Sequence, residues 1–301
     1  MVDYAPLWYW VKEREAIRER KLRRPVGAPL TGDPILAAYR FCNVRREDDR
    51  VTIWIRKHIR EPFADHPLLW LMLCIARQIN WPETLAVAMY GVSDTGDDWI
   101  GRNQGDAWPS HPHWRPDLLT ELLEDRKEQG AKVWTGAYVI SAGSEKGQPK
   151  SRYIAETVIG TLWQRIGTFR LLFGGKPSLR DVHMDLMRFP GWGAFMAYQA
   201  VVDMRFTKLL EHAADRQKWA AAGPGTIRGL NRLHGRRLDF SLPQDRALEE
   251  MRAIYERVTD ETGVVMDFSD VPNILCETDK YLRVKNGEGK PRATYVPGRG
   301  W

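Results

Sequence analysis

The chain has 301 residues, 43% of them hydrophobic and 28% charged, and its 45 lysines and arginines exceed its 39 acids for a net charge of +6. Such a chain can bury a full core in one large domain or two closely packed ones, and its basic charge suits a polyanionic partner. No apolar run is long enough to span a bilayer, and the three widely separated cysteines indicate neither a disulfide framework nor a zinc site.

Apolar residues recur at intervals of three and four along most of the chain, which predicts amphipathic helices. The predicted helices cover residues 7–22, 35–41, 51–59, 68–79, 118–123, 154–173, 179–187, 194–210 and 247–258. Only residues 132–140 have a short extended pattern, and prolines and glycines lie where the helices should end. We predict a mostly α-helical fold and treat residues 1–301 as a single domain.

The first polar cluster packs four arginines, three acids and an amide into residues 40–50. Carboxylates such as Asp48 and Asp49 can orient guanidinium groups, so that Arg45 and Arg46 would clamp a phosphate or pyrophosphate. In the alternative interpretation, the acids cap the next helix and pair with the arginines at the surface. The pattern favours neither hypothesis.

Gly191 and Gly193 lie between two predicted helices and flank Trp192. Without a Cβ, the backbone can turn sharply and present its amides to a DNA phosphate at the start of the next helix. This pattern predicts a helix-hairpin-helix over about residues 179–210, a motif that commonly grips DNA. The alternative is an ordinary tight turn with Trp192 plugging the core.

Asp203, in the second helix of that hairpin, stands among apolar residues. Partial burial would raise its pKa and suit it to act as a general base, although a helix acid paired with an arginine, or a cap, fits equally well. Further along, Gly225 and Arg228 open another predicted helix after a glycine-rich turn, which is a second possible phosphate nest.

Near the end of the chain, Glu277 and Lys280 would share a helical face. A plain surface ion pair is the alternative to a catalytic role for them. The segment 280–301 is basic, and Arg283, Lys290 and Arg292 could lie on DNA phosphates, although a solvated basic terminus explains such a run as well. A P-loop is excluded, because Arg170 and Pro177 stand where a glycine and a Ser or Thr are required.

Four separated strings carry a resemblance to a known family. They are YRFCNVRREDDRVTIWI, FPGWGAFMAYQAVVDMRF, AGPGTIRGLNRL and LCETDKYLRVKNGEGKPRATY, in that order between residues 39 and 295. Together they resemble the α-glutamyl/putrescinyl thymine pyrophosphorylases, or amino acid:DNA transferases, of bacteriophages that hypermodify thymine. A similar helical module is fused to kinases that act on 5-hydroxymethyluracil in DNA.

The resemblance implies a fold similar to that of helix-hairpin-helix DNA glycosylases and a substitution on double-stranded DNA. An amino acid or a polyamine would displace pyrophosphate from a 5-pyrophosphoryloxymethyl-uracil base that has been flipped out of the helix. No cofactor and no protein-bound metal are expected, although Mg²⁺ could accompany the pyrophosphate. Such a protein would work in the cytoplasm of the infected bacterium, away from membranes.

The resemblance also implies roles for individual residues. The pyrophosphate or DNA phosphates would be bound by Arg45, Arg46 and Arg228, with Asp48, Asp49 and Asp279 orienting these groups. Asp203 or Glu277 would be the base, Lys280 would stabilise the leaving group, and Gly191, Trp192, Gly193, Gly225, Arg283, Lys290 and Arg292 would contact DNA.

Phe195 occupies the position at which bifunctional glycosylases carry their Schiff-base lysine, so strand cleavage is not expected. A glycosylase that uses Asp203 to activate water and a non-catalytic DNA-binding protein remain the alternatives to the transferase.

Overall fold

The computed structural model describes residues 2–91, 105–136, 147–291 and 293–296. The chain divides into two compact units: unit 1 is formed by Met1–Asp49 and Gln217–Trp301, and unit 2 by Arg50–Arg216. Both ends of the chain therefore contribute to unit 1. The predicted mostly helical fold is confirmed, since the only β pairing within the described residues is an isolated antiparallel bridge between Tyr39 and Thr294.

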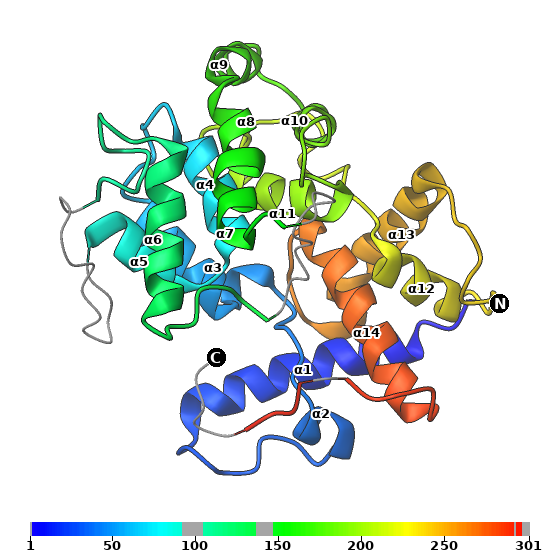
Figure 1. The fold of residues 1–301 in the computed structure, drawn as a ribbon. Coiled ribbons are helices and arrows are strands. Elements are labelled where there is room, and N and C mark those ends of the chain that lie inside the picture. Colours follow the sequence, from blue (N-terminus) through cyan, green and yellow to red (C-terminus); the bar gives the residue numbers. More distant parts are fainter. Residues whose placement is uncertain (1, 92–104, 137–146, 292, 297–301) are drawn as a thin grey trace. The chain divides into compact units, whose positions relative to one another are not determined.

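Unit 1 is centred on α14 (Val271–Lys285), which lies beside α12 and crosses α1 (Figure 1). The helices that pack against α14 are α1 (Ala5–Arg23), α2 (Pro34–Ala38), α12 (Pro224–Leu233) and α13 (Gln244–Thr262). The start of α14 is fixed by the 3-10 turn η4 (Phe268–Asp270), where Asp267 and Asp270 form a capping box. This arrangement places residues from both ends of the chain against one helix.

The contact between α12 and α14 is close because two glycines face it. A Cβ on Gly225 would overlap the Sγ atom of Cys276 and lie 3.3 Å from its Cβ atom, and a Cβ on Gly229 would lie 2.9 Å from the carbonyl carbon of Leu275. Gly225 and Gly229 are one helical turn apart, so both lie on the same face of α12. Their lack of a side chain lets the two helices approach.

Residues 293–295 pair with the segment after α2. The amide of Arg40 donates to the carbonyl of Ala293 at 3.1 Å, and the amide of Tyr295 donates to the carbonyl of Ala38 at 2.9 Å. This part of the basic segment 280–301 is therefore held within unit 1 by backbone hydrogen bonds.

Unit 2 is centred on α4 (Leu69–Ile79), whose residues are all buried. The left-handed Asn80 ends this helix, with φ of 49°. The other elements of unit 2 are α3 (Arg50–Ile55), the π-helical η2 (Arg56–Arg60), α5 (Pro82–Tyr90), α6 (Pro116–Glu128), α7 (Lys150–Arg152), the π-helical η3 (Tyr153–Ile159), α8 (Gly160–Trp163), α9 (Ile166–Gly174), α10 (Leu179–Leu186) and α11 (Ala194–Met204). Of these, α11 packs along α4.

The structure changes several predicted helix boundaries. The helix expected over residues 154–173 is divided into η3, α8 and α9, and the one expected over 194–210 ends at Met204. Helix α5 was not predicted; it begins at Pro82, in the first turn, where proline is well tolerated. Residues 132–136 form no strand, and residues 137–140 lie outside the described part of the chain.

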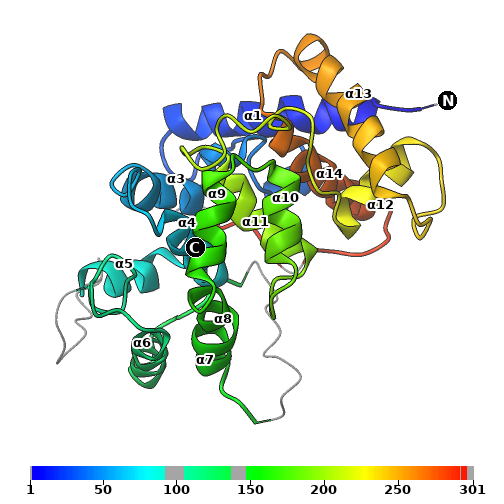
Figure 2. The ribbon, with the colours of Figure 1, turned by 90° about the horizontal axis from the view of Figure 1, so that it is seen from above.

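Helices α10 and α11 pack against each other and are joined by the glycine-containing turn (Figures 1 and 2). Ser178 and Asp181 form a capping box at the start of α10. In the turn, Gly191 has φ of +74°, and a Cβ there would lie 3.1 Å from the Cγ1 atom of Val158. Gly191 is therefore required both for the backbone conformation and for the packing of the turn.

Candidate functional site

The polar segment after α2 meets the start and middle of α14 in unit 1. The amide of Cys42 donates to Glu277 Oε2 at 3.0 Å, and the amide of Arg46 donates to Asp270 Oδ1 at 2.9 Å. Asn273 Nδ2 also donates to the carbonyl of Asn43 at 3.0 Å. Since α12 packs on α14, unit 1 brings together three of the four strings that carry the resemblance, apart from the end of the first.

Asp279 on α14 holds two arginines of α12. Its carboxylate accepts from Arg228 Nε at 3.0 Å and from Arg232 Nε at 2.7 Å, while Arg232 also bonds Glu288. Asp279 is 1% exposed, whereas the side chain of Arg228 is 44% exposed. A buried carboxylate thus fixes a guanidinium group that remains accessible to a ligand.

Glu277 and Lys280, on either side of Asp279 in α14, form a second cation held by a carboxylate. Lys280 Nζ lies 2.9 Å from Glu277 Oε2 and 4.6 Å from the ring centroid of Phe41. The side chains of Lys280 and Glu277 are 24% and 9% exposed, so the pair is more enclosed than the surface ion pair of the alternative interpretation. The ammonium group is oriented by a carboxylate and an aromatic ring.

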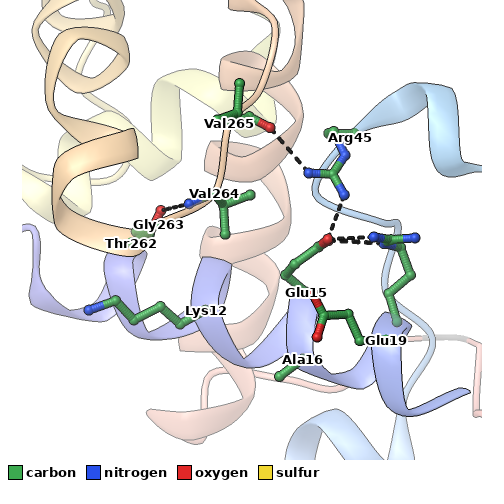
Figure 3. Close-up of a pocket in the computed structure, with 10 residues that line it drawn as sticks. Lys12, Glu15, Ala16, Glu19, Arg45, Thr262, Gly263, Val264 and Val265 are labelled. Carbon is green, nitrogen blue, oxygen red and sulfur yellow. Dashed lines mark hydrogen bonds and ion pairs between the residues drawn. The ribbon is translucent and has the colours of Figure 1, made fainter. Parts of the chain in front are cut away.

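Arg45 makes three side-chain contacts, two of which, to Val265 and to Glu15, are shown in Figure 3. Its Nε atom donates to Asp48 Oδ2 at 2.9 Å, its Nη1 atom donates to the carbonyl of Val265 at 3.1 Å, and its Nη2 atom bonds Glu15. Burial of Glu15 raises the pKa of its carboxyl, but hydrogen bonds and charge from Arg18 and Arg45 outweigh this and lower it. Glu15 is therefore a charged anchor for Arg45, and Asp48 is a second acidic partner of the same guanidinium group.

Asp49 lies beside this cluster and accepts a hydrogen bond from the amide of Asn43 at 3.0 Å. Burial of the carboxylate raises the pKa of Asp49 to about 6, although this hydrogen bond and the charges of Arg46 and Arg14 act in the opposite direction. A carboxyl group with this pKa changes charge near neutrality, as a general base requires. Sequence reasoning assigned Asp49 only an orienting role, because its surroundings come from distant segments.

Asp203 lies in unit 2 and is 0% exposed. Its two oxygens accept from Arg77, through Nε and through Nη2, the latter at 2.7 Å. Arg77 also donates to Thr52 Oγ1 at 3.0 Å and to Asn80 Oδ1 at 3.1 Å. Of the interpretations that the sequence left open, the structure has the acid paired with an arginine, within a buried network.

The residues expected to contact DNA fall into different environments. The indole of Trp192 is 1% exposed and donates to the carbonyl of Val158 at 3.3 Å, so it is a core side chain, as the alternative interpretation held. Gly193 begins α11 with open space at its Cβ position, whereas Gly225 faces Cys276. Arg283 is half-buried, Lys290 is exposed, and Arg292 lies outside the described residues.

None of the described helices combines the length and apolar character needed to cross a membrane. No cluster of three or more His, Cys, Asp or Glu side chains suited to a metal ion occurs in the part of the chain that the structure describes.

The comparison with protein families gives one match over almost the whole chain. The family model of the helical domain of 5-hmdU DNA kinase matches residues 3–291. The chain belongs to this family. The match runs through both compact units, so both are parts of the helical domain, and the predicted relation to the helical module of the 5-hydroxymethyluracil kinases is confirmed.

A curated relative agrees with the family match. The 5-hmdU DNA kinase of Bacillus phage SP10 is 26% identical over 237 residues, which cover 72% of this chain and 34% of the relative. The chain thus spans about a third of the length of this relative. No solved structure matches the chain significantly.

Proposed function

We propose that this chain hypermodifies thymine-derived bases in phage DNA. It would transfer an amine to the 5-methylene carbon of pyrophosphorylated 5-hydroxymethyluracil and release pyrophosphate. The observation that carries the proposal is the pair of accessible cations braced by buried carboxylates, Arg228 on Asp279 and Lys280 on Glu277, in a chain of the 5-hmdU DNA kinase helical-domain family.

The leaving group sets the main demand on the protein. As the C–O bond breaks, pyrophosphate departs with the electron pair and its negative charge increases. Arg228 and Lys280 are already oriented by carboxylates, so they can stabilise this charge without reorganising during the reaction. The planar guanidinium of Arg228 also matches two phosphate oxygens at once.

The nucleophile sets the second demand. The amine nitrogen forms the C–N bond and must lose a proton, which we assign to Asp49, whose pKa is raised to about 6. Glu277 accepts from both Lys280 and the amide of Cys42, so it serves as a brace for the cation. Asp203 is enclosed with Arg77, which supports a structural role and gives no support to a glycosylase that uses it to activate water.

DNA must present the modified base outside the double helix. We assign the DNA contact of unit 2 to the start of α11, where the amides after Gly193 form a helix N-terminus with open space beside it. In unit 1, Lys290 is exposed and available for a phosphate. These contacts position the substrate without selecting a base sequence.

The test is mass spectrometry of nucleosides from DNA that carries 5-pyrophosphoryloxymethyl-uracil, after incubation with the full chain and a mixture of amino acids and polyamines. We expect an amine-substituted deoxyuridine together with released pyrophosphate. Abasic sites with free base would move the assignment to a glycosylase. If the chain bound the DNA but left its bases unchanged, the result would favour a non-catalytic DNA-binding protein.

A matched pair of arginine variants links the result to the site. Arg228→Ala removes the braced guanidinium, whereas Arg237→Ala removes an arginine of the same unit whose side chain is 86% exposed and pairs only locally with Asp239. Loss of product with the first variant and full product with the second would support the assigned site.

A further inference from the structure

Unit 1 contains a pocket of about 500 Å³ whose role is not explained by the pyrophosphate site. One face of α1 forms its floor, Arg45 stands at one side, and the segment that follows α13 forms the opposite wall (Figure 3). The pocket belongs entirely to unit 1. It adjoins the bonded pair of Arg45 and Glu15, and its lining also includes charged side chains that are not bonded to this pair.

The floor of the pocket has a charge at each end. Lys12, Ala16 and Glu19 are spaced by four and three residues, so they share one face of α1. Lys12 and Glu19 are two turns apart, which corresponds to about 10 Å along the helix axis. The small side chain of Ala16 leaves the space between them open.

The central charges of the pocket are bonded to one another, whereas of the outer two only Glu19 has a favourable electrostatic interaction, with Arg18. Glu15 is bound by Arg18 at 2.6 Å and by Arg45, and Arg45 is further held by Asp48. Lys12 and Glu19 are both exposed, and neither makes a side-chain hydrogen bond or ion pair with another residue of the described ranges. The pocket therefore offers one cation and one anion to a ligand.

The opposite wall is largely backbone and aliphatic side chain. Helix α13 ends at Gly263, with φ of +73°, and the chain then turns across the pocket through Val264 and Val265. The carbonyl of Val265 holds Arg45, and its side chain is 68% exposed. This wall can contact the carbon chain of a small ligand, while the floor provides the charged contacts.

We propose that this pocket binds the amine donor, and that the donor is a zwitterion whose carboxylate faces Lys12 and whose ammonium faces Glu19. The assignment of the ligand as the donor rests on the proposed transfer. The four-carbon stem of Lys12 is flexible, so an amino acid with few carbons between its charges can still reach both side chains. A diamine would place one of its ammonium groups against Lys12 and is selected against.

The experiment measures binding of glycine, glutamate and putrescine to the full chain by isothermal titration calorimetry, without DNA. We expect an amino acid to bind about tenfold or more tightly than putrescine. Lys12→Glu should reverse this order, because it replaces the cation by an anion, and Glu19→Gln should weaken both kinds of ligand. Lys127→Gln changes an exposed lysine of α6 outside this pocket and should leave all affinities unchanged. Circular dichroism verifies that each variant is folded.

Equal affinity for amino acids and putrescine, or a preference that Lys12→Glu does not alter, would overturn the proposal. Parallel transfer assays separate it from the proposed function. If the wild type transfers amines but Lys12→Glu keeps the same donor preference, the pocket assignment fails and the transferase stands. If the binding preference reverses while no amine reaches DNA, the zwitterion pocket stands and the transferase fails.

Discussion

Asp279 in unit 1 and Asp203 in unit 2 are both buried carboxylates that accept hydrogen bonds from arginine, yet their partners differ. The side chain of Arg228, held by Asp279, is 44% exposed, whereas the side chain of Arg77, held by Asp203, is 2% exposed. The same chemical pair thus presents a cation to solvent in one unit and closes a core in the other. Exposure of the arginine, rather than burial of the acid, distinguishes a binding site from a scaffold.

Breaking the buried pair of Asp203 and Arg77 in unit 2 should have the largest effect on the stability of the protein. Asp203→Ala would leave the buried charge of Arg77 without this carboxylate, and such losses destabilise a protein by about 3–5 kcal/mol. Urea denaturation followed by tryptophan fluorescence measures this change. An Asp203→Ala protein with the stability of the wild type would show that the pair is not part of the scaffold.

Breaking the pair of Arg228 and Asp279 in unit 1 should instead reduce the activity and leave the stability almost unchanged. Arg228→Ala should reduce the rate of amine transfer by about 10²–10³, the usual result of removing one donor that stabilises developing charge. Its stability should change by only about 0.5 kcal/mol, because Arg232 still compensates Asp279. Rate and unfolding measurements on the same preparation test both parts, and an unaltered rate would remove Arg228 from the site.

Asp49 sharpens the comparison, because the cost of burying its carboxylate outweighs the hydrogen bond from Asn43 and the charges of Arg46 and Arg14. Its pKa is raised to about 6, so the folded protein holds a proton that the unfolded chain releases at lower pH, and Asp49 destabilises the fold increasingly as pH rises from about 4 to 7. Asp49→Asn should therefore gain stability relative to the wild type over this range, by at most about 3 kcal/mol.

Urea titrations of both proteins at several pH values measure this trend. A stability difference that is independent of pH would contradict the raised pKa. If Asp49 is also the base, the transfer rate of the wild type should fall as pH drops below about 6, and Asp49→Asn should lose this dependence.

The close contact of α12 and α14 positions Arg228 on α12 beside Asp279 on α14. Gly225→Ala would push a methyl group into Cys276, and overpacking of this kind destabilises by about 1–3 kcal/mol. The double variant with Cys276→Ala should recover much of the loss, since the Sγ atom that a Cβ would overlap is then absent. A simple sum of the two single effects in thermal unfolding would mean that the two positions do not touch.

Much of the helical fold could be predicted, because periodicity and helix ends are local properties of the sequence. The carboxylate partners could not be predicted in this way. Asp203 and Arg77 are 126 residues apart, and Arg228 and Asp279 are 51 apart, so their pairing depends on tertiary structure. One available signal was missed. The four-residue spacing of Gly225 and Gly229 places both glycines on one face of a helix, which indicates a close helix–helix contact rather than a phosphate nest.

The turn between α10 and α11 tests whether unit 2 is more than a scaffold. Gly191→Ala should destabilise the protein, because its φ is +74° and Val158 fills the space of a Cβ. Gly193→Ala should cost at most about 1 kcal/mol, because nothing lies within 4 Å of that Cβ position. A Cβ at Gly193 would nevertheless keep a phosphate away from the first amides of α11. We therefore expect Gly193→Ala to weaken duplex binding in fluorescence anisotropy while the protein stays folded, and an unchanged affinity would restrict DNA contact to other parts of the chain.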